Sequence, residues 1–311
     1  MTSAVRPTVS VIVPTFNRPA FLTRAIASVL AQTWQGFEVI VVDDGSAPSA
    51  HDIVRRFASA SVRLLSHDRN LGAAVARNTG LRSARGEYVA FLDDDDSWLP
   101  DKLSRQLDGF KSASADTALV YCGVATVAHP SGRVVKTFIP EAPALSFVDF
   151  LQHTAFGTSI PLISRRCLDE VGFFDESLPG THDRDLWLRL AQRFRFAFVP
   201  QVLAQCVIHG RQITTDLALK VEAKEKMLRK YRDELSQHPA ILAHQLVRLA
   251  MLEFACGRTA QARRRLAEAL CCRAQRGIYL HLILSRLAPP LHRRYIQRAA
   301  FRRVDGWSLY Y

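Results

Sequence analysis

Short apolar runs rich in β-branched residues alternate with helix-like patterns over the first 92 residues, and this alternation restricts the fold more than any other feature. The runs are continuous, as in strands that are buried on both faces. They lie at 9–13, 37–42, 61–67 and 87–92, and the helical patterns between them lie at 19–32, 51–58 and 71–84. This order predicts an α/β fold in which helices cover both faces of a mainly parallel sheet.

Polar residues follow three of the four expected strands, at the point where each strand ends. They are Thr15 to Arg18, the pair Asp43–Asp44 and the run Asp93 to Asp96. In open parallel sheets, ligands bind at the carboxyl ends of the strands, where the strand order switches. We therefore expect these three clusters to lie at one ligand site.

The four consecutive aspartates suit a divalent cation, since Mg²⁺ commonly takes one or two carboxylates together with substrate phosphates. If the strand geometry continues through the run, Asp93 and Asp95 point to one side and Asp94 to the other, unless a turn has already begun. The alternative is a solvated acidic turn, which the run by itself does not exclude.

Two further positions have both a ligand-binding and a structural interpretation. A carboxylate at Asp44 can accept hydrogen bonds from a nucleobase or ribose, or it can cap a helix or turn. Arg77, close to Asn70, Gly72 and Asn78, is either a phosphate partner or an arginine on a solvated helix face.

Beyond Pro100 the pattern becomes less regular. Residues 118–129 and 132–140 predict antiparallel strands around a Pro-Ser-Gly turn, and 195–208 predict further strands. Helical patterns occur at 101–112, 183–194 and throughout 217–272. We expect a catalytic domain over 1–215 and a basic α-helical region over 216–311.

The net charge of +12 is concentrated in that second region, where residues 215–311 hold 19 Lys/Arg against 8 Asp/Glu. Such a surface can meet an anionic membrane, nucleic acid or an acidic ligand. Apolar residues from Tyr279 to Leu287, with arginines nearby at 276, 286, 293 and 294, favour an interfacial helix that Pro289–Pro290 would end. Zinc-finger spacing, an RNP-type aromatic pattern and a clear helix-turn-helix are all missing, so specific nucleic-acid binding is not expected.

The location of the protein is judged from hydropathy and cysteines. No apolar run reaches the roughly 18–20 residues that span a bilayer, and the N-terminal sequence lacks a signal-peptide pattern. The six cysteines are scattered, without metal-ligand spacing, as expected of reduced thiols. We expect a cytoplasmic protein that is peripheral on the inner face of the cell membrane.

Taken together, five motifs resemble the family 2 glycosyltransferases of the GT-A fold, over about residues 7–215. They are VSVIVPTFNR (9–18), SVLAQTWQGFEVIVVDDGS (28–46), NLGAAVARNTGLRSARGEYVAFLDDDDSW (70–98), VGFFDE (171–176) and HDRDLWLRL (182–190). The resemblance implies a GT-A type mixed sheet covered on both faces, here with a C-terminal helical extension. It also implies an inverting, metal-dependent enzyme.

The resemblance implies roles for individual residues. Pro14, Thr15 and Asn17 would line the nucleotide site, Asp44 would bind the base, and Arg77 would lie close to the diphosphate. Within the DxD motif, Asp94 would approach the ribose. Asp95 would be the main ligand of Mn²⁺ or Mg²⁺, with Asp93 supporting it.

The family's catalytic base matches Asp183. Inverting transfer needs a carboxylate that removes the acceptor's proton as its oxygen attacks C1. His182 stands where many relatives have Glu or another polar residue, which leaves the pKa of Asp183 open. The alternative for Asp183 is a helix N-cap, and Asp185 would be the structural member of the pair. His209 would help to bind metal or diphosphate, or it is a lone histidine after a strand.

The expected substrates are a nucleotide-sugar donor, with a UDP-sugar favoured, and a hydroxyl of a polysaccharide or lipid-linked acceptor. The loop 153–159 would contribute to the acceptor pocket or be a polar surface loop. The rivals are a nucleotidyltransferase-like enzyme, which releases pyrophosphate, and a non-catalytic protein that binds nucleotides or uses its basic C-terminal region to bind nucleic acid.

Overall fold

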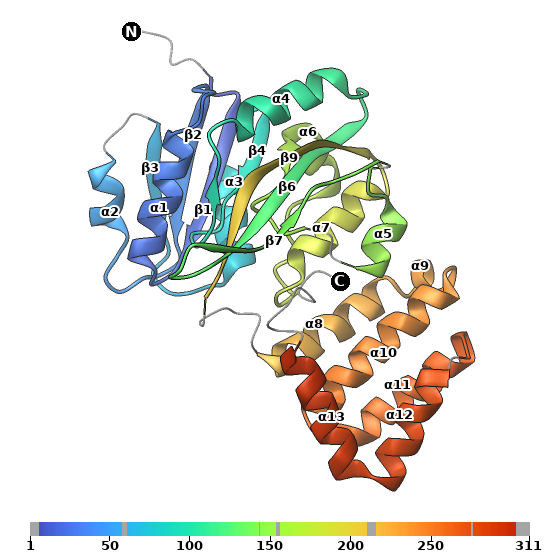
Figure 1. Cartoon of the computed structure of the whole chain (residues 1–311). Helices are drawn as coiled ribbons and strands as arrows, with labels where there is room; N and C mark the ends of the chain where they lie inside the picture. The colour runs from blue at the N-terminus through green and yellow to red at the C-terminus, as the bar shows by residue number, and fades with distance from the viewer. Residues whose placement is uncertain are drawn as a thin grey trace, which may run out of the picture. The chain divides into compact units, whose positions relative to one another are not determined.

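The computed structural model describes residues 6–57, 61–142, 144–153, 156–209, 216–274 and 276–302, which form two compact units (Figure 1). The first unit comprises Met1–Phe147, Phe156–Glu176 and Leu186–Gly210, and the second Val148–Ala155, Ser177–Asp185 and Arg211–Tyr311. The second unit thus includes two short segments from within the expected catalytic region, whose boundary at residue 215 stays a prediction.

Four parallel strands form one half of the sheet in the first unit, in the order β3-β2-β1-β4. They are β1 (Val9–Thr15), β2 (Phe37–Asp43), β3 (Val62–Ser66) and β4 (Tyr88–Phe91). Every residue of β1 and β2 is buried, as their continuous apolar sequences predict.

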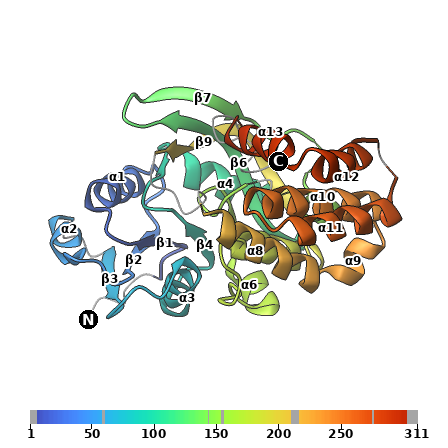
Figure 2. The ribbon, with the colours of Figure 1, turned by 90° about the horizontal axis from the view of Figure 1, so that it is seen from below.

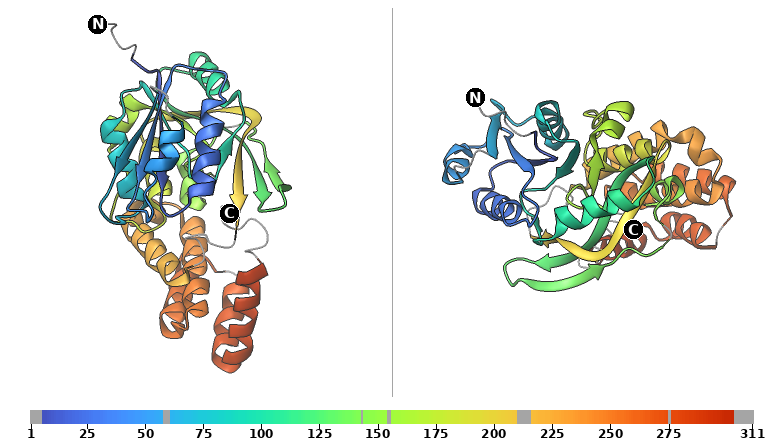
Figure 3. Two further views of the ribbon diagram at one scale, coloured as in Figure 1. Left: turned by 90° about the vertical axis from the view of Figure 1, so that its left-hand side faces the viewer. Right: turned by 90° about the horizontal axis from the view of Figure 1, so that it is seen from above.

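Helices cover both faces of these strands. Helices α1 (Pro19–Leu30) and α3 (Ala73–Ser83) lie on opposite faces, as the edge-on view of Figure 3 shows, while α2 (His51–Arg56) packs against α1 and β3. Leu22, Ile26 and Val29 recur at helical spacing on α1 and are buried. This arrangement confirms the expected sheet covered on both faces.

The other half of the sheet is mixed. Strand β8 (Leu162–Ser164) runs antiparallel to β4, and the sheet continues through β6 (Thr117–Ala128), β9 (Arg195–Ile208) and β5 (Ser97–Trp98). Strand β7 (Arg133–Phe138) pairs antiparallel with β6, as the sequence predicts. Helices α4 (Lys102–Ser112) and α6 (Arg165–Val171) pack on this half.

Strand β9 is one long strand where the sequence predicts several. Its pairing with β6 shifts at Pro200 and Gln201, because Cys122 pairs with Val199 while Gly123 pairs with Val202. Proline has no N–H for the ladder, so it is tolerated at such a bulge. A Cβ at Gly123 would lie 2.8 Å from the Gln201 carbonyl oxygen, so glycine makes room for the bulge.

The second unit is helical. Its helices are α5 (Phe147–Gln152), the start of α7 (His182–Ala191), α8 (Leu217–Lys230), α9 (Arg232–Ser236), α10 (Pro239–Ala255), α11 (Thr259–Cys272), α12 (Arg276–Leu287) and α13 (Pro289–Arg302). Helix α10 packs against both α8 and α11 and lies between them in Figure 1, and Figure 2 gives a view of the same helices from below. Leu246, Phe254, Leu266 and Ile278 belong to their apolar core. Across the described ranges, every helix is too short or too polar to cross a bilayer.

Candidate functional site

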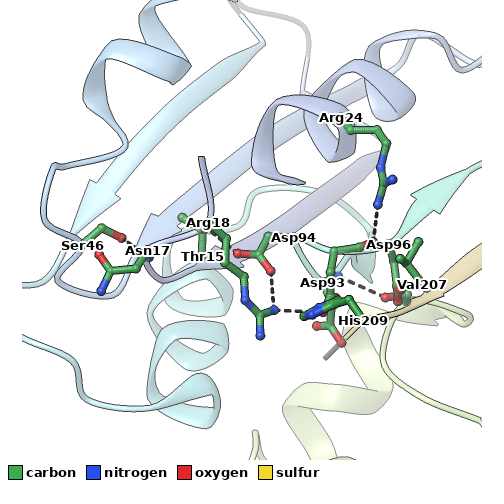
Figure 4. A network of polar contacts seen from close by, with 12 residues as sticks. Thr15, Asn17, Arg18, Arg24, Ser46, Asp93, Asp94, Asp96, Val207 and His209 are labelled. Carbon is green, nitrogen blue, oxygen red and sulfur yellow. Dashed lines mark hydrogen bonds and ion pairs between the residues drawn. The ribbon is translucent and has the colours of Figure 1, made fainter. Parts of the chain in front are cut away.

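The candidate site of the first unit lies where the strand order reverses, because β1 stands between β2 and β4. Thr15 ends β1. Asp93 to Asp96, which we call the acidic loop, follow Leu92, one residue beyond the end of β4 at Phe91. Figure 4 shows Arg18 pointing from the end of β1 toward the acidic loop. Thr15 and Arg18 contact Asp94 of this loop, and the Asp44 N–H donates to the Thr15 carbonyl at 2.9 Å. The three expected clusters therefore meet at this edge of the sheet.

Asp94 is buried and points toward β1. Its Oδ2 accepts a hydrogen bond of 2.8 Å from Thr15 Oγ1, and its Oδ1 lies 3.0 Å from Arg18 Nη1. Burial raises the pKa of Asp94 to about 6, although Arg18 and the Thr15 hydroxyl act in the opposite direction. The carboxyl group therefore titrates far above the ordinary range of an aspartate.

Asp95 is the meeting point of two basic side chains. Its Oδ2 lies 2.9 Å from Arg18 Nη1 and 2.9 Å from His209 Nε2. Burial opposes the charged form of Arg18, but Asp94 and Asp95 outweigh it and raise the arginine's pKa. A guanidinium group therefore lies between two carboxylates. His209 contacts Asp95, so it is not a lone histidine after a strand.

Asp93 faces a different set of partners. Its carboxylate accepts hydrogen bonds from Arg77 and, at 3.1 Å, from Thr158 Oγ1. The alternation of a continuing strand would have paired Asp93 with Asp95. A turn has already begun, since the Asp96 N–H donates to the Asp93 carbonyl at 3.0 Å, and the turn puts Asp94 and Asp95 together on Arg18. Arg77 is buried, which excludes the solvated-face interpretation.

Asp96 has no role in the sequence prediction, yet it is buried and ties the acidic loop to β9. Its carboxylate accepts hydrogen bonds from the Val207 N–H at 3.1 Å and from Cys206 Sγ at 3.3 Å. Burial, with the charges of Asp95 and Asp93, raises the pKa of Asp96 well above its ordinary value. No local signal separates this aspartate from the three before it.

The residues expected at the nucleobase hold loops together. Asp44 accepts hydrogen bonds from the backbone N–H groups of Leu71 at 2.9 Å and Gly72 at 2.8 Å, and it lies 2.7 Å from His67 Nδ1. Asn17, at φ 55°, accepts the Ala47 N–H through Oδ1 at 2.8 Å. Pro14 is a buried residue of β1. These contacts favour the turn interpretation of Asp44, and its role toward a base stays a prediction.

Asp183 belongs to the second unit, as does its neighbour Asp185. Asp183 is partly buried at the start of α7, and its Oδ1 accepts the Arg184 N–H at 2.7 Å. Asp185 is fully buried, 2.7 Å from Lys230 Nζ and 2.8 Å from the Tyr231 hydroxyl. Asp185 thus has a structural environment, while Asp183 is only partly buried. Thr154 and Ala155 of the expected acceptor loop lie outside the described residues.

The side chains that could bind the expected metal ion are Asp93, Asp95 and His209. Asp95 and His209 offer a carboxylate oxygen and an imidazole nitrogen in contact, while Asp93 is turned to Arg77. In the part of the chain that the structure describes, no three His, Cys, Asp or Glu gather as a metal-binding group. Two protein ligands are enough for Mn²⁺ or Mg²⁺ when a diphosphate completes the shell, so the residues fit a metal that arrives with a nucleotide.

Comparison with known proteins identifies relatives. The family model "Glycosyl transferase family 2" matches residues 10–170. The chain is 31% identical over 231 residues to the putative teichuronic acid biosynthesis glycosyltransferase TuaG of Bacillus subtilis, covering 73% of this chain and 88% of TuaG. It is 32% identical over 252 residues to the succinoglycan biosynthesis protein ExoO of Rhizobium meliloti, covering 74% and 71%.

Two solved structures share the fold. TarS 1–349 of S. aureus in complex with UDP-GlcNAc has a TM-score of 0.64 at 20% identity, covering 96% of this chain and 90% of that one. The mannosyltransferase PcManGT of Pyrobaculum calidifontis, in complex with GDP-Man and Mn²⁺, has a TM-score of 0.58 at 22% identity, covering 96% and 86%.

Proposed function

Because this chain belongs to glycosyl transferase family 2, we propose that it is an inverting, metal-dependent glycosyltransferase of polysaccharide or lipid-linked precursor synthesis. One observation carries the proposal: Arg18, a cation, lies between Asp94 and Asp95 at the switch in strand order. Two neighbouring carboxylates need positive charge, and a metal–diphosphate complex supplies it when a donor is bound.

The donor of this proposal is a UDP-sugar. A nucleotide sugar is supported by the neighbours, one bound to UDP-GlcNAc and one to GDP-Man, which leave the base open. Asp95 and His209 would hold the Mn²⁺ or Mg²⁺, with Asp93 in support, and Asp94 would receive the ribose. Pro14, Thr15, Asn17 and Asp44 would surround the nucleoside, and Arg77 would lie close to the diphosphate.

The chemical step rests on Asp183 as general base. Its carboxylate removes the proton of the acceptor hydroxyl while the oxygen attacks C1 of the sugar, and the nucleoside diphosphate leaves from the opposite face. A bound divalent cation supplies charge stabilisation of that leaving group. Asp183 is half-buried at the start of α7, and its Oδ1 accepts the backbone N–H of Arg184.

A thermal-shift screen of UDP, GDP and their sugars, with and without Mn²⁺, tests the donor site. A ligand that binds the folded state at 100 times its Kd adds about 2.7 kcal/mol to stability. We expect a Mn²⁺-dependent shift with UDP that Asp95→Ala abolishes and that Asp108→Ala, an exposed control paired with Lys111, retains. No shift with any nucleotide in the folded wild type contradicts the proposal. Release of pyrophosphate in place of nucleoside diphosphate supports the nucleotidyltransferase rival.

A membrane surface is the proposed location of the acceptor. Helices α12 and α13 expose large apolar side chains, with Leu287 81% exposed, in a region of strong positive charge. The exposed residues are Tyr279, Leu280, Ile283, Leu287, Leu291 and Tyr295. Apolar groups flanked by cations suit the anionic inner leaflet. Co-sedimentation with anionic vesicles should weaken in Leu280→Ser/Leu287→Ser, and equal sedimentation with neutral vesicles contradicts this location.

A further inference from the structure

A cluster of basic side chains surrounds the C-terminal end of α5 in the second unit. It draws on four helices that are distant in sequence, and its members are His153, Arg184, Lys224, His244 and Arg248. We call this set the basic cluster. The donor site described above makes no use of it.

Hydrogen bonds place two of these cations at one point. Arg184 donates from Nε to the Phe150 carbonyl at 2.8 Å and from Nη2 to the Leu151 carbonyl at 2.7 Å. Gln245 donates to the same Leu151 carbonyl at 2.9 Å, and its Oε1 accepts a hydrogen bond from Lys224 Nζ. Arg184 and Lys224 therefore converge on the last turn of α5.

The charges of the cluster act on one another. Burial, with the positive charges of Arg184 and Arg248, lowers the pKa of Lys224 well below its ordinary value. Burial and Arg248 lower the pKa of Arg184 to about 10. Two carboxylates face the cluster, Asp183 beside Arg184 and Asp149 beside His153. Like charges held this close cost free energy, and that cost calls for an anion.

A purely structural role explains only part of the cluster. Arg184 and Gln245 satisfy carbonyl groups at the end of α5, as helix ends require. Lys224 reaches α5 only through the neutral amide of Gln245, and His244 is exposed to solvent. Arg184, Lys224 and Arg248 are themselves partly exposed, so an anion can reach the cluster from solvent.

We propose that the basic cluster binds an oxyanion, a phosphoryl or carboxylate group, carried by the acceptor. Guanidinium N–H groups and the lysine ammonium group donate charge-assisted hydrogen bonds to such oxyanions. The charge of Asp183 acts on the Arg184 guanidinium, so an anion held by Arg184 would lie near the candidate base. The assignment to the acceptor rests on the proposed function, whereas the anion binding itself does not.

The test is a titration of the full-length protein with inorganic phosphate, pyrophosphate and sulfate, at ionic strength matched with chloride, without donor or metal. We expect a stabilising shift in the wild type that Lys224→Met weakens at least tenfold in apparent affinity. Lys220→Met is the matched control one turn earlier on α8, since burial alone lowers the pKa of Lys220. No shift in the wild type, or equal shifts in all three proteins, overturns the proposal.

Proton uptake separates the basic cluster from other cationic surfaces. Because an anion favours the charged form of Lys224, sulfate binding should take up a fraction of a proton at any pH where part of the Lys224 population is neutral. Calorimetry in two buffers of different ionisation enthalpy measures this uptake, which Lys224→Met should remove. Unchanged uptake in Lys224→Met overturns the role of Lys224.

Two further arms identify the source of the anion. Acetate compared with phosphate distinguishes a carboxylate from a phosphoryl group. UDP with Mn²⁺ should shift Lys224→Met as it shifts the wild type, and loss of that shift overturns the acceptor assignment. A wild type that binds phosphate but no nucleotide contradicts the proposed function alone.

Discussion

The acidic loop of the first unit and the basic cluster of the second unit both hold like charges close together, but the charges have opposite signs. At the acidic loop, each of three aspartates meets a basic or polar partner, with Arg18 shared by Asp94 and Asp95. In the basic cluster, the positive charges of Arg184, Lys224 and Arg248 repel one another. Arg184 and Lys224 donate hydrogen bonds to neutral acceptors, a backbone carbonyl and the Gln245 amide. The first arrangement is suited to receiving a cation and the second to receiving an anion.

The largest expected effect separates proton removal from donor binding. Asp183→Asn should lower kcat about 10²–10⁴-fold, as expected for loss of a general base. The Mn²⁺-dependent nucleotide shift should persist, because the donor site belongs to the first unit. Single-turnover transfer and the thermal-shift screen measure the two properties, and full transfer activity in Asp183→Asn refutes its role.

A smaller effect tests Arg18 as the cation of the acidic loop. Arg18→Met leaves Asp94 and Asp95 without their shared partner and should destabilise the metal-free protein by about 2 kcal/mol. That is less than the roughly 3–5 kcal/mol for a fully buried pair, because the Arg18 side chain is 26% exposed. Mn²⁺ should restore part of the loss in chemical denaturation. If Mn²⁺ stabilises the wild type more than the variant, Arg18 does not stand in for a cation.

Opposite pH dependences should distinguish the two regions in metal-free protein. The raised pKa of Asp94, about 6, means that the wild type loses stability as pH rises from about 4 to 6, so Asp94→Asn should gain relative stability there. The lowered pKa of Lys224 means that the wild type loses stability as pH falls below 10.5, so the advantage of Lys224→Met should shrink at alkaline pH.

The predicted quantity is the sign of each slope, which follows from the direction of each pKa shift. Denaturant midpoints across pH 4–10 measure both, with Lys220→Met as the control on α8. Parallel slopes for Asp94→Asn and Lys224→Met would mean that the two regions do not differ in the way described.

The smallest expected effect on stability comes from an isolated surface ion pair, which serves as a reference for the two clusters. Lys111 and Asp108 form an exposed pair at 2.8 Å on α4. Lys111→Gln should change stability by less than about 0.5 kcal/mol, because solvent screens such pairs. A larger change in thermal unfolding would show that an isolated surface charge affects the stability of this protein as much as the clustered charges do.

Much of the site was predictable because its signals are local. The continuous apolar strands, the acidic run after β4 and the family motifs lie within short stretches, and each strand ends near its expected position. The role of Asp96 was not predictable. Its partners, Cys206 and Val207, lie more than 100 residues further along the chain, on β9.

The amino-acid sequence by itself determined the parallel half of the sheet, its covering helices and the family, since hydrophobic periodicity and motif spacing are encoded residue by residue. Only the tertiary structure decided how charges pair. The chain turns at Asp93, and this turn places Asp94 and Asp95 together on Arg18. The packing of α5, α7, α8 and α10 brings the side chains of the basic cluster together. Such convergence depends on contacts between distant segments, which no local pattern contains.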